Sequence, residues 1–352
     1  MPPLPPSTPR LIAYYQTHHD EDGSFISILP FVREPGIEVT HVNLAALHIN
    51  ADPDALTLND HPPSHPRFDT LWAELRILQA SGVKVLAMLG GAAKGTYERL
   101  DGDPAVFERY YGPLRDVLRD RSLDGVDLDV EEPMSLAGIV RLIDRLRADF
   151  GQAFLITLAP VAAALIDRRR NLSGFDYADL EALRGRDIAW YHAQFYCGWG
   201  DCSNPLLYEL MVRRGWPANR VVVGLVTNPE NGSGYVPWEA VSHVLPLLLA
   251  RHPGFGGVVG WEYFNSLPGG RARPWEWARW MTALLRGEKA AAPPPGALSE
   301  VREMAERERA SRVLTHEADD DGGHGEAPVP RDFDYYSDDE TADDRLDGEK
   351  LP

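Results

Sequence analysis

The segment that most constrains the fold of this chain is residues 123–131, with the sequence LDGVDLDVE. Its carboxylates Asp127, Asp129 and Glu131 alternate with aliphatic residues. Because successive side chains of a strand point to opposite faces, the three acids share one face, roughly 7 Å apart, and the aliphatic residues share the other. An acidic row is unfavourable inside an ordinary core, where like charges repel and lose solvation. The pattern predicts the wall of a barrel, with the acids facing the lumen or its mouth.

Apolar segments alternate with helical segments along most of the chain. The predicted strands are residues 11–15, 39–47, 83–89, 123–131, 154–160, 188–196, 220–226 and 256–261. The predicted helices are residues 68–80, 104–118, 136–150, 177–183, 205–214, 237–251 and 274–286. Eight strands separated in this way predict an α/β fold with a closed (β/α)8 barrel, the TIM barrel. An open, doubly wound sheet is the alternative, and the missing Gly-rich loop after the first strand counts against it.

Composition divides the chain into four regions. Residues 1–9 form a Pro-rich leader, and residues 10–286 hold the single barrel domain. Residues 287–315 contain a linker and a stretch that could form a charged helix. Residues 316–352 hold 14 acidic and 3 basic residues, so −11 of the net charge of −18 lies there. This acidic composition, poor in aliphatic residues, predicts a disordered tail.

Charge and hydropathy limit the classes of partner. No contiguous basic stretch is available to meet phosphates, which argues against nucleic acid as a partner. The N-terminus shows no secretory signal pattern, and no apolar run approaches the roughly 18 residues of a membrane span. We therefore expect a soluble, cytoplasmic monomer that does not bind membranes.

Cysteine and histidine give no sign of a metal or a cofactor. Cys197 and Cys202 could bridge to each other, but two cysteines make no disulfide framework, and free thiols suit a reducing compartment better. The histidines at positions 41, 48, 61 and 65 lack the spacing of a zinc site. We expect neither a metal nor a cofactor.

The acidic row is the candidate site for chemistry. Active sites of (β/α)8 barrels lie at the carboxyl ends of the strands, where Asp129 and Glu131 are expected. The nearby aspartates would raise the pKa of at least one carboxyl group and keep a proton available near neutral pH. Glu131 is outermost in the row and is therefore the candidate acid. Asp124 has the opposite strand parity, so we expect a structural role for it.

The spacing Asp124-x-x-Asp127-x-Asp129-x-Glu131 resembles the signature of glycoside hydrolase family 18, the chitinases and endo-β-N-acetylglucosaminidases. The resemblance implies a mechanism in which the N-acetyl carbonyl of the substrate is the nucleophile, an exception to the scheme with two catalytic carboxylates. It implies that Glu131 protonates the glycosidic oxygen and later activates water. It also implies that Asp129 orients the acetamido group and shares a proton with Asp127.

Other segments agree with this resemblance over residues 10–285. Gln194-Phe195-Tyr196 resembles the family segment whose tyrosine hydroxyl bonds the acetamido oxygen, which gives Tyr196 a role beside Gln194. Gly90-Gly91 resembles a glycine pair at which the backbone approaches the sugar; Met88 stands where the family usually has serine.

Aromatic residues at the strand ends complete the predicted site. Trp261 resembles the tryptophan under the reactive sugar, and sugar faces stack on such rings. Tyr14 and Glu262 are expected to line the groove, and Trp199 is expected to stack on sugar.

Taken together, the resemblance implies a retaining, endo-acting hydrolase that cleaves β-1,4 bonds at N-acetylglucosamine. About 30 residues separate the ends of the last two strands and are taken up by a helix, which leaves no room for an inserted domain and predicts an open cleft. Chitin oligomers and the core of N-glycans remain alternative substrates, and a cytoplasmic location favours free N-glycans. An inactive chitin- or glycan-binding lectin of the same fold is the alternative from another class.

Overall fold

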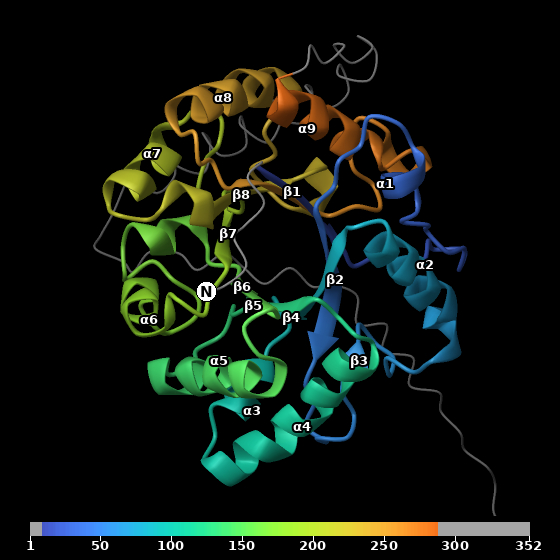
Figure 1. The fold of residues 1–352 in the computed structure, drawn as a ribbon, viewed down its shortest axis with the longest axis vertical. Helices are drawn as coiled ribbons and strands as arrows, with labels where there is room; N and C mark the ends of the chain where they lie inside the picture. The colour runs from blue at the N-terminus through green and yellow to red at the C-terminus, as the bar shows by residue number, and fades with distance from the viewer. Residues whose placement is uncertain (1–8, 288–352) are drawn as a thin grey trace, which may run out of the picture.

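The computed structural model describes residues 9–287 and folds them into a closed barrel of eight parallel strands (Figure 1). The strands are β1 (Arg10–Tyr15), β2 (His41–His48), β4 (Lys84–Gly90), β5 (Gly125–Asp129), β6 (Leu155–Leu158), β7 (Trp190–Gln194), β8 (Val221–Val226) and β9 (Gly257–Trp261). Because β1 pairs in parallel with both β2 and β9, no edge of the sheet is left open. The (β/α)8 barrel predicted from the sequence is confirmed.

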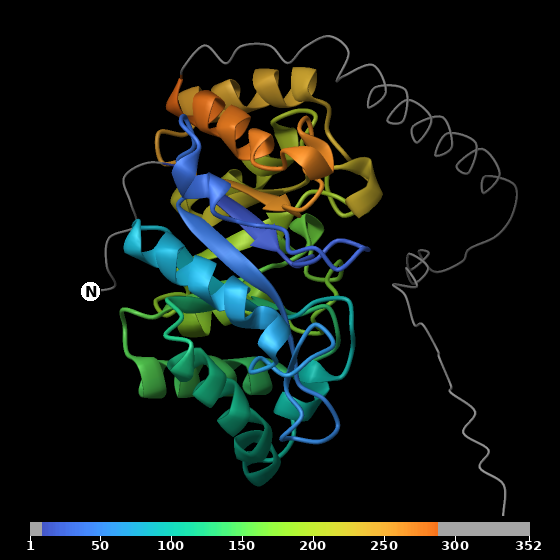
Figure 2. The same cartoon turned by 90° about the vertical axis from the view of Figure 1, so that its right-hand side faces the viewer.

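Helices surround the barrel on its outside (Figures 1 and 2). They are α1 (Pro30–Arg33), α2 (Asp69–Ala80), α3 (Thr96–Leu100), α4 (Pro104–Asp120), α5 (Leu136–Phe150), α6 (Tyr177–Arg184), α7 (Leu206–Arg213), α8 (Trp238–Arg251) and α9 (Glu276–Arg286). Short 3-10 helices span Pro66–Phe68, Ala162–Leu165, Ala218–Arg220, Pro229–Asn231 and Gly270–Ala272. Within residues 9–287, no helix combines the length and apolarity required to cross a bilayer.

The alternation of side chains along the strands produces two separate cores. Side chains such as Val126 and Leu128 of β5 point outward and pack against the helices in the larger apolar cluster. Side chains of the opposite parity fill the lumen, where a smaller cluster includes Met88, Trp190 and Val259. The acids of β5 share this inward parity, so the barrel directs them away from the helices.

The acidic strand is shorter than the sequence predicts. Its last paired residue is Asp129, opposite Gly90 of β4. Gly90 and Gly91 then adopt φ values of 89° and 92°, which turn β4 away from β5 and end the ladder. Glu131 therefore lies two residues beyond the strand, over the mouth of the barrel.

Apart from the 3-10 helices, three short elements were not predicted. Helices α1 and α3 each span only about one turn, too short for an apolar stripe to be recognised. The strand β3 (Thr57–Leu58) pairs with β2 in antiparallel fashion and consists of two residues. The predictions for residues 1–8 and 288–352, the latter including the charged helix and the acidic tail, lie outside the described residues.

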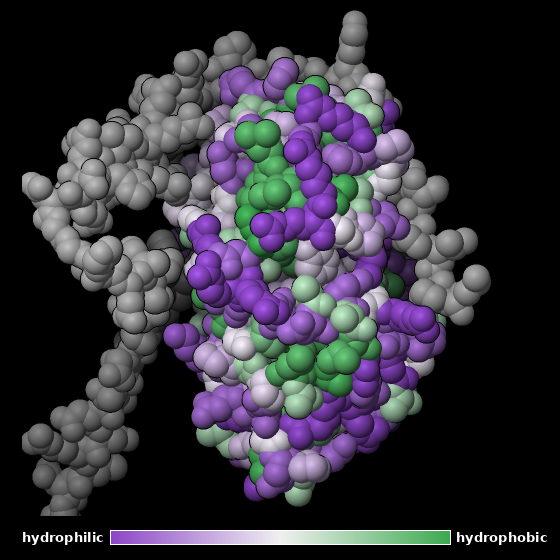
Figure 3. All heavy atoms as spheres, turned by 90° about the vertical axis from the view of Figure 1, so that its left-hand side faces the viewer, coloured by the Kyte–Doolittle hydropathy of each residue, from purple (hydrophilic) through white to green (hydrophobic). Residues whose placement is uncertain are grey.

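Most large apolar side chains are covered, but some on the outer helices are not. Leu206 and Leu210 of α7 are 68% and 39% exposed, and Leu183 of α6 is 53% exposed. Figure 3 shows apolar areas on the face of the molecule that carries α6 and α7. Apolar side chains exposed on this scale are usual on folded proteins.

Candidate active site

Asp127, Asp129 and Glu131 lie in one row that rises through the lumen to the mouth of the barrel. Asp127 is fully buried and Asp129 is 5% exposed, whereas Glu131 is only partly buried. The row thus leads from the interior to the surface, with the candidate acid at the exposed end.

Asp127 is held by donors from four other strands, of which the amide of Asn43, on β2, is the most distant at 3.4 Å. The Tyr14 hydroxyl of β1 donates to Oδ2 at 2.6 Å, and the Thr157 hydroxyl of β6 donates to Oδ1 at 2.5 Å. Nδ1 of His192, on β7, lies 3.0 Å from Oδ1. Burial raises the pKa of Asp127, but the electrostatic attraction of His192, followed by the hydrogen bonds from His192, Thr157 and Tyr14, outweighs it and holds the pKa below the usual value. The surroundings of Asp127 therefore favour its ionised form.

Asp129 and Glu131 share the side-chain amide of Gln194, the last residue of β7. The amide nitrogen lies 3.2 Å from Asp129 Oδ1, 3.1 Å from Glu131 Oε1 and 3.0 Å from the carbonyl oxygen of Ala159. Burial and repulsion from Glu131 and Asp127 raise the pKa of Asp129 well above its usual value. Burial also raises the pKa of Glu131, opposed by the hydrogen bond from Gln194. The pair is therefore suited to holding a proton near neutral pH.

Tyr196 lies two residues beyond Gln194 and is partly exposed. Burial, followed by the charges of Asp129 and Glu131, raises the pKa of its phenol well above the usual value. The hydroxyl therefore remains a hydrogen-bond donor at any pH at which the protein would be assayed. No hydrogen bond from another described residue occupies this hydroxyl, so it can bond a ligand beside the carboxylates.

The glycine pair after β4 permits a close approach to Asp129. A Cβ atom on Gly90 would lie 2.6 Å from the carbonyl oxygen of Asp129, and one on Gly91 would lie 2.7 Å from Cε of Met88. The amide of Gly91 donates to the Asp129 carbonyl oxygen at 2.9 Å. This crowding explains why both positions are glycine. Contact of Gly90 and Gly91 with a sugar stays a prediction.

Trp261 ends β9 at the mouth and is partly exposed. Its indole packs edge-on against Tyr14, with ring centroids 5.2 Å apart. A tryptophan anchored in the lumen cluster with part of its surface open can serve as a platform for an apolar sugar face.

Three residues expected in the groove have less access to it. Tyr14 is 3% exposed and lies below the acidic row, bonded to Asp127. Glu262 is buried, and its carboxylate accepts hydrogen bonds from Thr17 and from the amide of Gln16, so it holds the loop after β1. Trp199 is partly buried and packs against the outer core. Because Tyr14 and Glu262 are buried, any effect of theirs on a substrate is exerted through the residues that they contact.

Asp124 lies just before β5, at the end of the barrel away from the mouth. Its Oδ2 accepts from the amide of Val85 at 2.9 Å and from the side chain of Gln79 at 2.8 Å. Its Oδ1 pairs with Lys84 at 2.8 Å. These contacts join β5 to β4 and α2, which supports a structural role.

Sequence reasoning missed several polar residues around the row. Thr157, His192 and Asn43 each interrupt an apolar strand at the inward parity, and this interruption was the signal that could have found them. Glu132 is buried, and its two carboxylate oxygens accept from the amides of Gly95 and Tyr97, both at 2.6 Å. It fixes the start of α3, and no periodicity in the sequence indicates this.

The thiol of Cys202 is buried and free, so Cys197 and Cys202 do not bridge to each other. Burial raises the pKa of Cys202 to about 12. A thiol with this pKa stays protonated at neutral pH and takes no part in the site.

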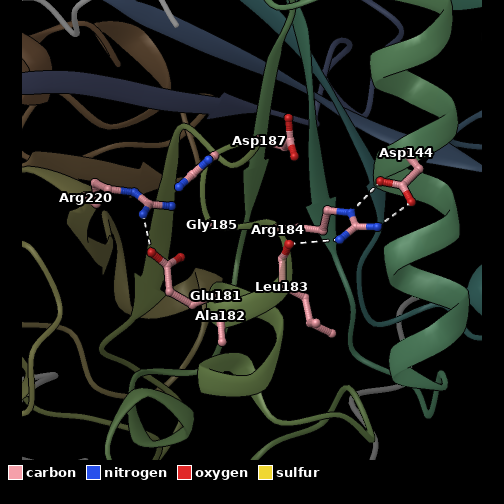
Figure 4. A pocket seen from close by; sticks show the side chains of 9 residues that line it. Asp144, Glu181, Ala182, Leu183, Arg184, Gly185, Asp187 and Arg220 are labelled. Carbon is pink, nitrogen blue, oxygen red and sulfur yellow. Dashed lines mark hydrogen bonds and ion pairs between the residues drawn. The ribbon is translucent and has the colours of Figure 1, made fainter. Parts of the chain in front are cut away.

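A hollow of about 740 Å³ lies at the opposite end of the barrel, near the start of β7 and β8 (Figure 4). Two ion pairs line it, Arg184 with Asp144 and Arg220 with Glu181. Because the hollow lies at the end of the barrel away from the acidic row, it is not the candidate active site.

The barrel and the acidic row at its mouth define an enzyme of the glycoside hydrolase class. The family model described as glycosyl hydrolases family 18 matches residues 10–227. The match covers more than half of the chain, and the chain belongs to that family. The resemblance read from the motif is thereby confirmed.

Two solved structures and one further relative agree with this family assignment. A fungal endo-β-N-acetylglucosaminidase of family 18 is 50% identical, with a TM-score of 0.77, and the match covers 79% of this chain and 99% of that one. The chitinase ChiC of Aspergillus fumigatus is 55% identical, with a TM-score of 0.72, covering 78% and 98%. Chitinase 2 of Rhizopus oligosporus is 28% identical over 205 residues, which are 54% of this chain and 36% of that protein. The chain thus matches little more than a third of the length of that relative.

Proposed function

We propose that this protein is an endo-acting, retaining glycoside hydrolase that cleaves β-1,4 bonds at N-acetylglucosamine by substrate-assisted catalysis. The observation that carries the proposal is that the single amide of Gln194 bonds both Asp129 and Glu131, with the buried carboxyl group of Asp127 beneath them. This arrangement supports a pair that holds a proton at the mouth of the barrel.

The chemistry follows from these positions. Glu131, at the exposed end of the row, gives its proton to the glycosidic oxygen as the bond breaks. The acetamido oxygen of the same sugar attacks the anomeric carbon and forms an oxazolinium ion. Asp129 orients the acetamido group through its N–H, and the Tyr196 hydroxyl donates to the acetamido oxygen. Glu131, now ionised, then removes a proton from the water that opens this ring with net retention.

An open cleft supports internal cleavage. Between β8 and β9, residues 227–256 consist of loops, one 3-10 helix and α8, with no inserted domain. The mouth is therefore not walled on this side, and a long or branched chain can lie across it.

Chitin oligomers are the substrate we propose first, on the strength of the 55% identical chitinase. The core of N-glycans is the alternative, favoured by the 50% identical fungal endo-β-N-acetylglucosaminidase. The test is turnover of chitin oligomers and of a high-mannose N-glycopeptide by wild type and Glu131→Gln, with sugar binding measured in parallel. Wild type should cleave one of the two substrates, and the variant should lose about 10²–10⁴-fold in kcat while still binding sugar.

Glu132→Gln is the matched control. Glu132 is the neighbouring carboxylate, yet its two oxygens accept from backbone amides at the start of α3. Its variant should keep near-wild-type turnover and lose about 1–2 kcal/mol of stability. Equal turnover by wild type and Glu131→Gln would overturn the assigned acid. Sugar binding without turnover by either protein would favour a lectin.

A further inference from the structure

Two lumen residues near Asp127 have no part in the proposed chemistry so far. Trp190 and His192 lie two residues apart on β7, both point inward, and both are almost completely buried. The indole Nε1–H of Trp190 donates to Nε2 of His192 at 2.6 Å. On the other side of the ring, Nδ1 lies 3.0 Å from Asp127 Oδ1. The three side chains form one hydrogen-bonded column inside the barrel.

The direction of the first hydrogen bond fixes the state of the imidazole. An indole nitrogen can only donate, so Nε2 of His192 must accept and carries no proton. A ring that lacks a proton on Nε2 is neutral and carries its proton on Nδ1. Nδ1–H therefore points at the carboxylate of Asp127 as a donor. Without Trp190, either ring nitrogen could be protonated, and one of the two neutral tautomers would present a lone pair to Asp127.

Other charged and titratable groups face this column. The buried guanidinium of Arg10 lies 4.2 Å from the centre of the Trp190 ring, and the ring of His41 packs against Trp190 at 4.8 Å. Tyr14 lies beside His192, with its hydroxyl 3.3 Å from Nδ1. Trp190 therefore separates Arg10 from His192, and the donors that reach Asp127 are neutral groups.

The neighbours of Asp127 in the sheet explain why β7 must contribute. On β4 the residue in register is Met88, which offers no hydrogen-bond donor. On β6 it is Thr157, whose hydroxyl donates. His192, on β7, therefore supplies Asp127 with a hydrogen-bond donor that Met88, on β4, cannot provide.

We propose that Trp190 and His192 are positioning residues for hydrolysis: Trp190 holds His192 as the neutral Nδ1–H tautomer, and His192 thereby donates to Asp127 and orients its carboxyl group beneath Asp129. This inference rests on the proposed function, since it assigns the two residues a part in that reaction. The charge held on Asp127 repels a second charge on Asp129, so the column helps Asp129 to keep its proton.

The tautomer can be observed without any substrate. In 15N-histidine-labelled protein, two-bond 15N–1H correlations distinguish a protonated from an unprotonated ring nitrogen. The chain has 11 histidines, and the signals missing from His192→Asn assign the ring. Wild type should show Nδ1 protonated and Nε2 unprotonated at neutral pH. An Nε2–H tautomer or a doubly protonated ring at this pH would overturn the proposal.

Kinetics then test the positioning role. His192→Leu removes the Nδ1–H donor to the carboxylate of Asp127. The variant should lower kcat about 10²-fold and keep KM within about threefold of wild type. In His192→Asn the amide takes the place of Nδ1–H, and kcat should recover to within about tenfold of wild type. His41→Gln is the control, because His41 contacts Trp190 but is not among the donors to Asp127; its kcat should be unchanged.

Trp190→Phe gives an independent readout. The ring of His192 can then take up a second proton at Nε2, and the added positive charge should favour ionisation of Asp129 and Glu131. The basic limb of the kcat/KM profile should move to lower pH by about 0.5–1 unit. If the basic limb of Trp190→Phe did not move, or if His192→Leu kept the kcat of wild type, the positioning role of Trp190 and His192 would be overturned. If wild type itself turned over neither substrate, the proposed function would fail, and the spectra would still decide the tautomer.

Discussion

Gln194 and Glu131 are 63 residues apart in the chain, yet the amide nitrogen of one lies 3.1 Å from Oε1 of the other. The same amide nitrogen has three acceptors but only two hydrogens. Binding of a ligand or transfer of a proton at the pair must therefore redistribute these hydrogen bonds. Gln194 therefore links Glu131, the proposed acid, to Asp129.

Removing this amide should change both rate and pH dependence. The hydrogen bond from Gln194 lowers the pKa of Glu131 against the effect of burial, so Gln194→Leu should raise that pKa further. The basic limb of kcat/KM, along which the acid loses its proton, should move to higher pH, and kcat should fall by about 10–10²-fold. A pH–rate profile measures both. A limb that moves to lower pH would contradict the assigned contact.

Tyr14→Phe should weaken the protein most in acid. A depressed pKa stabilises the fold above the unfolded-state value, about 3.9, and this stabilisation is lost as the pH falls through the folded-state pKa. The variant removes a donor, raises the folded-state pKa of Asp127, and so should shift acid unfolding to higher pH. Circular dichroism followed from pH 6 to pH 2 measures the midpoint. Thr157→Val removes another donor to Asp127 and should shift it the same way; shifts of opposite sign in the two variants would refute this reading.

Trp261 should act on binding. Trp261→Ala removes the aromatic surface at the end of β9 and should raise the Kd for an N-acetylglucosamine oligomer about tenfold, or about 1.4 kcal/mol. Trp261→Phe keeps a ring and should lose less. Calorimetric titration in the Glu131→Gln background separates binding from turnover. Unchanged affinity in Trp261→Ala would place the sugar elsewhere.

Asp124 should matter for stability and not for chemistry. Asp124→Ala leaves the amide of Val85 and the side chain of Gln79 without their acceptor and should cost about 1–3 kcal/mol in the free energy of unfolding. Lys84→Ala removes only the exposed half of the ion pair and should cost less than about 1 kcal/mol. Urea unfolding gives both values. A loss of kcat in folded Asp124→Ala would show that its role is not confined to structure.

The barrel and the acidic row were predictable because both rest on strict periodicities. Alternation along residues 123–131 placed Asp127 and Asp129 on one face, and their inward direction follows from the apolar outer face. The pair Gln194 and Tyr196 could be located only through the family motif, since nothing local in the sequence shows which strands meet at the mouth.

The partners of Asp127 could not be predicted by the same means. Thr157 and His192 come from β6 and β7, and their distance to Asp127 depends on the register and curvature of the closed sheet. Glu132 follows Glu131 directly, yet it turns back to cap α3, because the chain leaves the strand at Asp129. Burial could not be predicted either: Glu262 and Tyr14 lie at strand ends, as expected, but Glu262 is covered by the loop after β1 and Tyr14 by the lumen cluster, and their place in the groove stays a prediction.

The most direct test of substrate-assisted retention is the anomeric form of the first product. Proton NMR, started within the first minutes of hydrolysis of whichever substrate wild type cleaves, reads the configuration before mutarotation. Substrate-assisted retention predicts the β-anomer at the new reducing end, because attack by the acetamido oxygen and then by water inverts the anomeric carbon twice. Initial formation of the α-anomer would mean a single displacement by water and would contradict the roles given to Asp129, Glu131 and Tyr196.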